Sequence, residues 1–279
     1  MTTRTAMRRL TGTAAAGAAA LLALTACSSS SSDSSRSPGS GKPSAPSTSS
    51  APSKVSGTVV VFAAASLKES FTTLGTAFSQ AYPGAKVVFN FGGSDTLAAS
   101  ITGGAPADVF AAASPKTMKT VTDAGDGSGT PASFVRNQLE IATLPGNPDH
   151  IASLKDLTKS GLKVALCART VPCGAAAQTA LTAGNLELTP VSYEQDVKSA
   201  LTKVELKEVD ASVVYRTDVK AAGGKVDGVD FPESAKAINA YPIVALKDAP
   251  NPTAAQAFIA LVQSAEGQKV LGEAGFLKP

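Results

Sequence analysis

The chain has no tryptophan and a single histidine, and only 5% of its 279 residues are aromatic. Because 43% of the residues are nevertheless apolar, a core must be built mostly from Ala, Val, Leu and Ile. It is large enough for one large or two medium α/β lobes. The lone histidine, His150, lies in a loop rich in proline and glycine, which is a poor place for a general base. With so few imidazole and thiol groups, we expect no zinc site.

Excess charge of either sign is also lacking. The formal net charge of +3 comes from 25 basic and 22 acidic residues. Arg4, Arg8 and Arg9 lie in an N-terminal segment that we expect to be removed, and taking these three from the 25 leaves 22 basic against 22 acidic residues. A neutral domain has no electrostatic footprint for nucleic acid and no polybasic face for lipid headgroups, so we expect neither partner for the folded part.

An apolar run from Thr13 to Leu24 follows the N-terminal arginines and is too short to span a bilayer comfortably. It ends in Leu24-Thr25-Ala26-Cys27, which resembles the bacterial lipobox. That resemblance implies that residues 1–26 are a lipoprotein signal peptide and that Cys27 is diacylated and begins the mature protein. The alternative is an ordinary signal peptide with an incidental cysteine.

Serine and proline dominate residues 27–56, which hold almost no large apolar side chain. Such a composition cannot form a core, so this segment should stay extended and solvated. We expect it to be a tether between a lipid anchor, on the outer face of the cytoplasmic membrane, and a folded domain.

The folded part begins near Gly57 with a continuous apolar run, Thr58 to Ala63, which is typical of a buried parallel strand. Apolar residues then recur at helical spacing from Leu67 to Phe78, and Ser66 with Glu69 fits a capping box for that helix. Further strands are expected at Lys86 to Phe91, Asp108 to Ala112, Gln138 to Leu144, Lys163 to Leu166, Ser212 to Tyr215 and Ala240 to Leu246. Further helices are expected at Thr96 to Thr102, after Ser114, at Ser153 to Lys159, Pro172 to Ala183 and Asp196 to Val204, and after Asn251.

This alternation of strand and helix predicts two α/β lobes with mostly parallel, doubly wound sheets. We expect the first lobe to consist of residues 57–137 and 232–279, and the second of residues 138–231. The segments that cross between the lobes should lie near Arg136 to Gln138 and Phe231 to Tyr241.

Ligands of such sheets bind beyond the carboxyl ends of the strands, where helices begin. Four of these junctions carry small or neutral residues, namely Ala63 to Ser66, Phe91 to Ser94, Val171 to Gly174 and Gln195 to Val197. The first turn of a helix has N–H groups without partners and a partial positive charge, so several such turns facing one point would bind an oxyanion without lysine or arginine. Taken singly, each junction is also explained as an ordinary N-cap, turn or first-turn proline.

Two cysteines remain beyond the N-terminal segment, Cys167 and Cys173. In an oxidising compartment such a pair is a candidate disulfide, and a turn from strand to helix could bring the two sulfurs within bonding distance. The alternative is two free thiols.

Seven segments in order resemble periplasmic molybdate-binding proteins of ABC importers. They are Val61 to Leu67 (VFAAASL), Phe91 to Leu97 (FGGSDTL), Gly104 to Phe110 (GAPADVF), Val171 to Gly174 (VPCG), Glu194 to Val197 (EQDV), Val213 to Tyr215 (VVY) and Phe231 to Glu233 (FPE). The resemblance runs in register from about Gly57 to the end of the chain. It implies a two-lobed class II periplasmic-binding-protein fold, a ligand (molybdate or tungstate) in the cleft between the lobes, a membrane permease as partner, a monomer, and no cofactor.

The resemblance also assigns roles to five residues. Ser66 and Ser94 would give hydroxyl and backbone N–H bonds from the first lobe. Cys173 and Val197 would give backbone N–H bonds from the second lobe, and Tyr215 its phenol O–H. The chain departs from many relatives at Gly92-Gly93-Ser94, where they are richer in serine, and at Cys173, where they often have alanine. Asp95 would repel a dianion, so we expect it to face outward.

Molybdate at neutral pH carries no proton, so its site needs hydrogen-bond donors only, whereas phosphate keeps at least one proton and usually requires an acceptor too. Sulfate has the same charge and shape but is smaller, so its rejection must depend on cavity size. Binding of sulfate or phosphate is the main alternative. A hydrolase with Ser66 as nucleophile is a remote one, because G-x-S-x-G is absent, and a purely structural lipoprotein would not need so many anion-type junctions. We expect a binding protein and not an enzyme.

Overall fold

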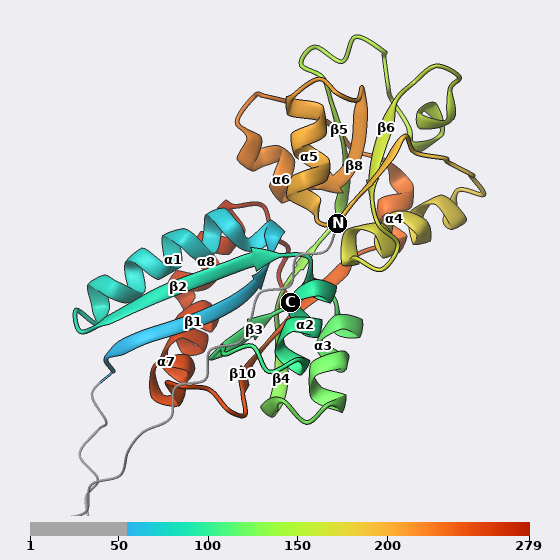
Figure 1. Cartoon of the computed structure of the whole chain (residues 1–279). Coiled ribbons are helices and arrows are strands. Elements are labelled where there is room, and N and C mark those ends of the chain that lie inside the picture. Colours follow the sequence, from blue (N-terminus) through green and yellow to red (C-terminus); the bar gives the residue numbers. More distant parts are fainter. Residues whose placement is uncertain (1–54) are drawn as a thin grey trace, which may run out of the picture. The chain divides into compact units, whose positions relative to one another are not determined.

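The computed structural model describes residues 55–279 (Figure 1). The predicted signal peptide, Cys27 and almost all of the predicted tether lie outside the described residues. Within the described part of the chain, no helix is both long enough and apolar enough to cross a bilayer.

Within residues 55–279, ten strands form two separate five-stranded sheets. The first sheet has the order β2-β1-β3-β10-β4, with β1 Gly57–Ala64, β2 Ala85–Gly92, β3 Val109–Ala111, β4 Gly127–Asn137 and β10 Asn239–Leu246. The second has the order β7-β6-β8-β5-β9, with β5 Leu139–Thr143, β6 Val164–Cys167, β7 Ser192–Glu194, β8 Ala211–Tyr215 and β9 Asp227–Val229.

The two sheets follow the same plan. In the first, β1 is parallel to β2 and β3, and β10 is antiparallel to β3 and β4. In the second, β6 is parallel to β7 and β8, and β5 is antiparallel to β8 and β9. Each sheet therefore has one reversed strand in the fourth position, and the others run the same way, as the predicted mostly parallel sheets require.

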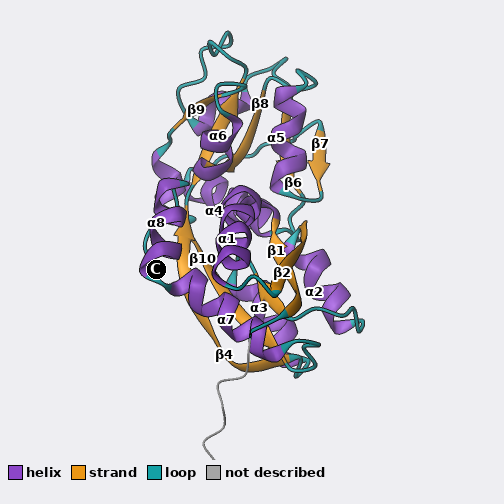
Figure 2. Cartoon of the chain, turned by 90° about the vertical axis from the view of Figure 1, so that its left-hand side faces the viewer, coloured by secondary structure: helices purple, strands orange, loops and turns teal. Residues whose placement is uncertain are grey.

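Helices cover both sheets (Figure 2). Those that accompany the first sheet are α1 Lys68–Ala81, α2 Ser94–Thr102, α3 Pro115–Asp123, α7 Pro252–Gln263 and α8 Ala265–Glu273. Those of the second sheet are α4 Pro172–Ala183, α5 Val197–Glu205 and α6 Arg216–Ala222. Three short 3-10 helices complete the set, η1 Ala65–Leu67, η2 Leu154–Thr158 and η3 Pro232–Lys236.

Helix α1 shows how the apolar spacing becomes a core. Phe71, Leu74 and Phe78 recur at intervals of three and four residues, and all three are fully buried against the first sheet. The rings of Phe71 and Phe78 each meet Phe258 of α7 edge-on, with centroids 5.7 Å apart. The few aromatic residues of the chain are thus concentrated in the first sheet's core.

The chain crosses between the sheets through two strands that lie side by side. Strand β4 ends at Asn137 and β5 of the other sheet begins at Leu139. The return passes through η3 into β10, which begins at Asn239, and Asn137 and Asn239 are partners in the β4–β10 ladder. Both crossings fall in the segments predicted for them.

Some elements differ from those predicted. Residues Ser153 to Lys159 were expected to form a helix, and the helix found there is the short 3-10 helix η2. Strand β4 was not predicted, because Gly127 to Pro131 is a polar, glycine-rich stretch without strand alternation. It becomes a strand because the long apolar strand β10 pairs with it.

Candidate functional site

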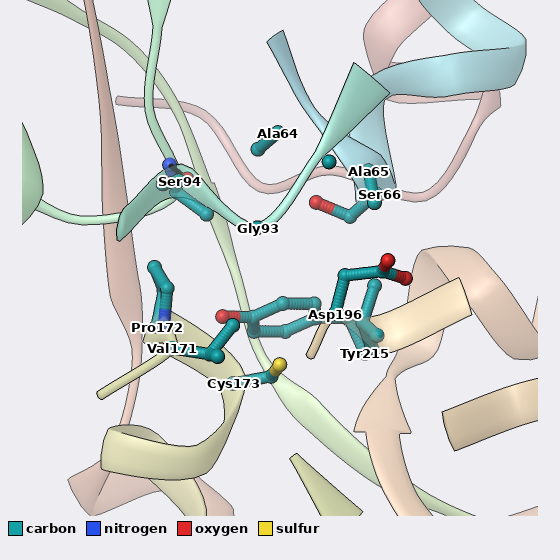
Figure 3. A pocket seen from close by; sticks show the side chains of 13 residues that line it. Ala64, Ala65, Ser66, Gly93, Ser94, Val171, Pro172, Cys173, Asp196 and Tyr215 are labelled. Carbon is teal, nitrogen blue, oxygen red and sulfur yellow. Dashed lines mark hydrogen bonds between the residues drawn. The ribbon is translucent and has the colours of Figure 1, made fainter. Parts of the chain in front are cut away.

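A cavity lies where helix N-termini of both sheets converge (Figure 3). Its lining residues are Ala64, Ala65, Ser66, Gly92, Gly93, Ser94, Ala113, Val171, Pro172, Cys173, Asp196, Val197 and Tyr215. These include all five residues that the sequence assigned to a ligand, although they come from segments up to 149 residues apart. The structure therefore brings the predicted set together in one place.

The cavity is small, and the predicted ligand residues that line it are buried. The volume open to the centre of a water molecule is about 10 Å³, so a sugar, peptide or organic cofactor has no room in this arrangement of the lobes. Ser66, the most exposed of the five predicted residues, has only 4% of its surface accessible.

The cavity wall is almost free of charge. Among the described residues that line it, none is a lysine, arginine or histidine, and Asp196 is the one ionisable carboxylate. The Asp196 carboxylate accepts hydrogen bonds from the N–H of Ser199 at 2.9 Å and from the Ser199 hydroxyl at 3.2 Å. Figure 3 shows it on the side away from the Tyr215 hydroxyl.

Backbone N–H groups at helix starts are one source of donors. The 3-10 helix η1 and helices α2 and α4 begin without a side chain that caps their first turn. In α4 the first residue is Pro172, which has no N–H, so the first available donor is the N–H of Cys173. In α5 the Asp196 cap covers the N–H of Ser199 and leaves that of Val197 available.

Ser94 is held as a hydroxyl donor. Its Oγ accepts the N–H of Ala113 at 3.0 Å, so a lone pair of the oxygen is occupied. Only 1% of Ser94 is exposed, and the hydroxyl proton remains free for a ligand.

Ser66 was predicted to cap the helix at Leu67 to Phe78 together with Glu69, and this was wrong. The chain enters the helix through the 3-10 turn η1, so neither α1 nor η1 has a side-chain cap. Ser66 Oγ instead lies 2.8 Å from the hydroxyl oxygen of Tyr241 on β10, and Glu69 pairs with Lys198.

Tyr215 lies at the end of β8, with 1% of its surface exposed. Its hydroxyl oxygen accepts the Nδ2–H of Asn239 at 2.6 Å. Burial raises the pKa of the Tyr215 phenol well above its usual range. The phenol therefore keeps its proton and is available as a donor.

The two lobes approach each other closely at Gly93. A Cβ atom on Gly93 would lie 2.5 Å from the carbonyl oxygen of Gln195, in the loop before α5. The departure from a serine-rich motif thus removes side-chain bulk where the lobes meet. Asp95 is not among the residues that line the cavity.

Cys167 and Cys173 form a disulfide, with Cα atoms 5.8 Å apart. The bond ties the end of β6 to the first turn of α4, which is the turn that offers the Cys173 N–H. Gly174 follows in the same turn, and a Cβ there would lie 2.0 Å from the carbonyl oxygen of Ala168. The turn and the strand end are therefore packed too closely for a side chain at position 174.

An ionic contact joins the lobes beside the site. Lys198 of α5 lies 2.9 Å from a carboxylate oxygen of Glu69 on α1 and 3.1 Å from one of Asp218 on α6. Asp218 is fully buried, and this burial raises the pKa of its carboxyl to about 6. The cation nearest to Val197 in sequence is thus paired with two carboxylates.

The residues that hydrogen-bond the cavity's hydroxyl groups from outside the cavity were not predicted from the sequence. Three residues lie outside the cavity but are hydrogen-bonded to its lining or to each other. Asn239 bonds Tyr215, Tyr241 bonds Ser66, and Asn137 bonds Tyr241. Their partners lie 24 to 175 residues away. No local spacing could have revealed them, and only the strong apolar pattern around Tyr241 placed it in a strand.

Two lobes that enclose a small cavity, lined by neutral N–H and O–H donors from both, define a protein that captures a small solute. The chain belongs to the family of bacterial extracellular solute-binding proteins, whose profile matches residues 59–277.

Named relatives agree with this class. The chain is 42% identical over 230 residues to the molybdate-binding protein ModA of Mycobacterium tuberculosis, a match that covers 82% of this chain and 88% of the relative. The periplasmic molybdate-binding protein of Azotobacter vinelandii shares the fold with a TM-score of 0.70 at 20% identity, over 79% of this chain and 99% of that one. The sulfate-binding protein SubI of M. tuberculosis shares it with a TM-score of 0.67 at 18% identity, over 78% and 86%. These relatives are solute-binding proteins and not enzymes.

Proposed function

We propose that this protein captures molybdate, or tungstate, outside the cytoplasmic membrane and delivers it to the permease of an ABC importer. The observation that carries the proposal is the cavity itself, where uncharged N–H and O–H groups from both lobes converge without a lysine or arginine among the described lining residues. The 42% identity to a molybdate-binding protein supports the choice of anion.

The ligand set that we propose is Ser66, Ser94, Cys173, Val197 and Tyr215. Ser66, Ser94 and Tyr215 would donate hydroxyl protons, and Cys173 and Val197 would donate backbone N–H groups. A tetrahedral dianion without a proton accepts such bonds at every oxygen, and helix N-termini add favourable dipoles. Sulfate fits the same description but is smaller, so donors spaced for the larger anion would leave its hydrogen bonds stretched, and sulfate should bind more weakly.

Titration calorimetry of the purified protein with molybdate, tungstate, sulfate and phosphate tests the proposal. We expect heat of binding with molybdate and tungstate and far weaker binding of the other two. Binding of sulfate or phosphate alone would reject the choice of anion, and no heat with any anion would reject the binding function.

We further propose that the protein is a monomer held at the outer face of the cytoplasmic membrane by a lipid on Cys27. The N-terminal sequence supports this assignment through its lipobox-like segment and the serine-rich residues after it. Mass spectrometry of the protein isolated from bacterial membranes should find a diacylated Cys27 at the N-terminus, and Cys27→Ser should release the protein into the soluble fraction. An unmodified, membrane-free wild-type protein would contradict it.

A further inference from the structure

Asn137 and Asn239 are paired on the two crossing strands, and each faces a buried tyrosine. We infer that this asparagine pair sets the direction of the hydroxyl protons in the cavity and thereby restricts the site to anions that carry no proton. The inference rests on the proposed function and names two specificity-determining residues that do not line the cavity. They act as positioning residues, through Tyr215 and through Tyr241 with Ser66.

The orientation of each side-chain amide is fixed by a second partner. Asn239 Nδ2 donates to the carbonyl oxygen of Pro172 at 3.3 Å, and a carbonyl can only accept. Asn137 Oδ1 accepts the backbone N–H of Gln138 at 3.0 Å, and an N–H can only donate. The amide nitrogens, and not the oxygens, therefore face the tyrosines.

The amide nitrogen of Asn239 makes Tyr215 a donor. It lies 2.6 Å from the phenol oxygen, and because the nitrogen is a donor only, the phenol must accept this bond. The phenol proton then has no role toward Asn239. Its remaining acceptors are the neighbouring hydroxyl of Tyr241 and a ligand in the cavity, which Tyr215 lines.

Asn137 acts on Ser66 indirectly, through the hydroxyl of Tyr241. Its Nδ2–H donates to the Tyr241 hydroxyl at 3.3 Å, and the Tyr241 oxygen lies 2.8 Å from Ser66 Oγ. Because the Asn137 amide nitrogen can only donate, the Tyr241 proton cannot go to it and is directed to Ser66 Oγ, which lies within hydrogen-bond distance. The Ser66 proton is then free for the cavity, and the direction of both hydroxyl groups follows from one amide.

This arrangement determines which tetrahedral anions fit. With the Ser66, Ser94 and Tyr215 hydroxyls all presenting protons, an oxygen that carries its own proton finds no acceptor among them. Monohydrogen phosphate would leave that proton unpaired, which is costly in a buried site. Molybdate, tungstate and sulfate have no such proton, so the asparagine pair selects by protonation and leaves selection by size to the cavity.

The test is Asn239→Asp in the full chain, with molybdate and phosphate titrations near pH 8 and near pH 5.5. The new carboxylate accepts the Tyr215 proton, so the phenol turns a lone pair toward the cavity. Near pH 8 we expect molybdate affinity to fall about tenfold or more and phosphate affinity to fall much less or to rise. Near pH 5.5 molybdate affinity should recover, because the introduced carboxyl group, once protonated, donates to Tyr215 as the amide does.

Asn137→Asp repeats the test at the other tyrosine, with the same expected result, should the first variant not fold. Asn185→Asp adds the same charge at an exposed position of the second lobe and should change neither affinity. Equal losses for molybdate and phosphate without recovery at low pH, or no change at all, would overturn the inference. Molybdate binding by the wild-type protein tests the proposed function separately. Failure of the proposed function can therefore be distinguished from failure of this inference.

Discussion

At the scale of single residues, the site presents hydrogen-bond donors that are already aligned and already removed from water. Ser94 and Tyr215 are both almost completely buried, and each accepts a hydrogen bond from another residue of the protein. The free-energy cost of removing these groups from water is therefore incurred when the protein folds and not when the ligand binds. A donor of this kind left unpaired costs about 1–3 kcal/mol, which is why each contributes strongly to selectivity.

Tyr215→Phe removes one donor and keeps the ring, which packs edge-on against Tyr241 with centroids 6.0 Å apart. We expect molybdate to bind about 1–2 kcal/mol more weakly, roughly 5- to 30-fold, with little loss of folding stability. Calorimetry measures the change. Tyr193→Phe, at an exposed tyrosine of β7, is the matched control and should bind as the wild-type protein does. Equal affinity of both variants would remove Tyr215 from the ligand set.

At the scale of elements, the fold delivers helix N-termini to one point because each helix follows a strand of the same direction. Strand β1 leads into η1, β2 into α2, β6 into α4 and β7 into α5, and all four strands end at the edge where the cavity lies. The α2 and α5 junctions come from different sheets and meet at Gly93, so the contact at this glycine controls closure.

Gly93→Ala should oppose closure of the lobes. The added Cβ would meet the backbone carbonyl oxygen of Gln195, in the other lobe, at 2.5 Å. It would also meet the carboxylate of Asp95, a side chain of its own lobe that can move aside, at 2.8 Å. Overpacking of this kind costs about 1–3 kcal/mol, so we expect molybdate affinity to fall on the order of tenfold. Thermal unfolding of the ligand-free protein should change little.

The control is Gly272→Ala in α8, where a Cβ meets nothing within 4 Å. It should leave affinity unchanged and stabilise the helix slightly. If Gly93→Ala bound molybdate as tightly as the control, the close approach of the lobes at Gly93 would not be part of the bound state.

The disulfide should matter for stability more than for binding. The double variant Cys167→Ala/Cys173→Ala opens a short loop, and loop-closure entropy predicts a loss of about 2 kcal/mol in the free energy of unfolding. Because Cys173 would contribute its backbone N–H, molybdate affinity should stay close to that of the wild-type protein. Urea denaturation and calorimetry measure the two quantities. A large loss of affinity with the stability retained would contradict the backbone assignment.

At the scale of the whole molecule, the lobes are joined by two strands, by hydrogen bonds from Asn137 to Thr217 and from Asn239 to Tyr215, and by the Glu69–Lys198–Asp218 contact. Lys198 is shared between a carboxylate of the first lobe and a buried one of the second. Since Asp218 is fully buried, its charge depends on this pairing, and the contact between lobes is linked to pH.

The pH dependence has a definite sign. Burial raises the pKa of Asp218 to about 6, above its value in the unfolded chain, so the folded protein holds this proton more tightly. The contribution of this group to stability is fully present below about pH 4 and is lost as the pH rises to about 6. Above that pH it no longer changes.

Asp218→Asn should remove this part of the pH profile. The difference in unfolding free energy between variant and wild-type protein, measured by urea denaturation, should shift between about pH 4 and pH 6 and stay constant above. Asp123→Asn, at an exposed pair with Lys119, is the matched control for the loss of one carboxylate at the surface. A constant difference for Asp218→Asn across the window would show that Asp218 does not titrate there.

The sequence by itself predicted most of the strands and helices near the site, because apolar runs and helical spacing are local signals. Helix α4 was predicted with the observed bounds, from Pro172 to the residue before Gly184. The five candidate ligands came from a resemblance between short ordered motifs, and the structure places them around one cavity. Strand β4 and the role of Ser66 were misread, because a partner strand and a 3-10 turn override local preference.

What the residues alone determined was therefore the order of the elements and the neutral, donor-rich character of their junctions. What only the tertiary structure decided was direction: which way each hydroxyl points, and which side chain holds it there. Asn239 lies 24 residues from Tyr215, and Tyr241 lies 175 from Ser66, so no local pattern encodes these bonds. They exist because the two crossing strands pair, and strand pairing is a property of the folded chain.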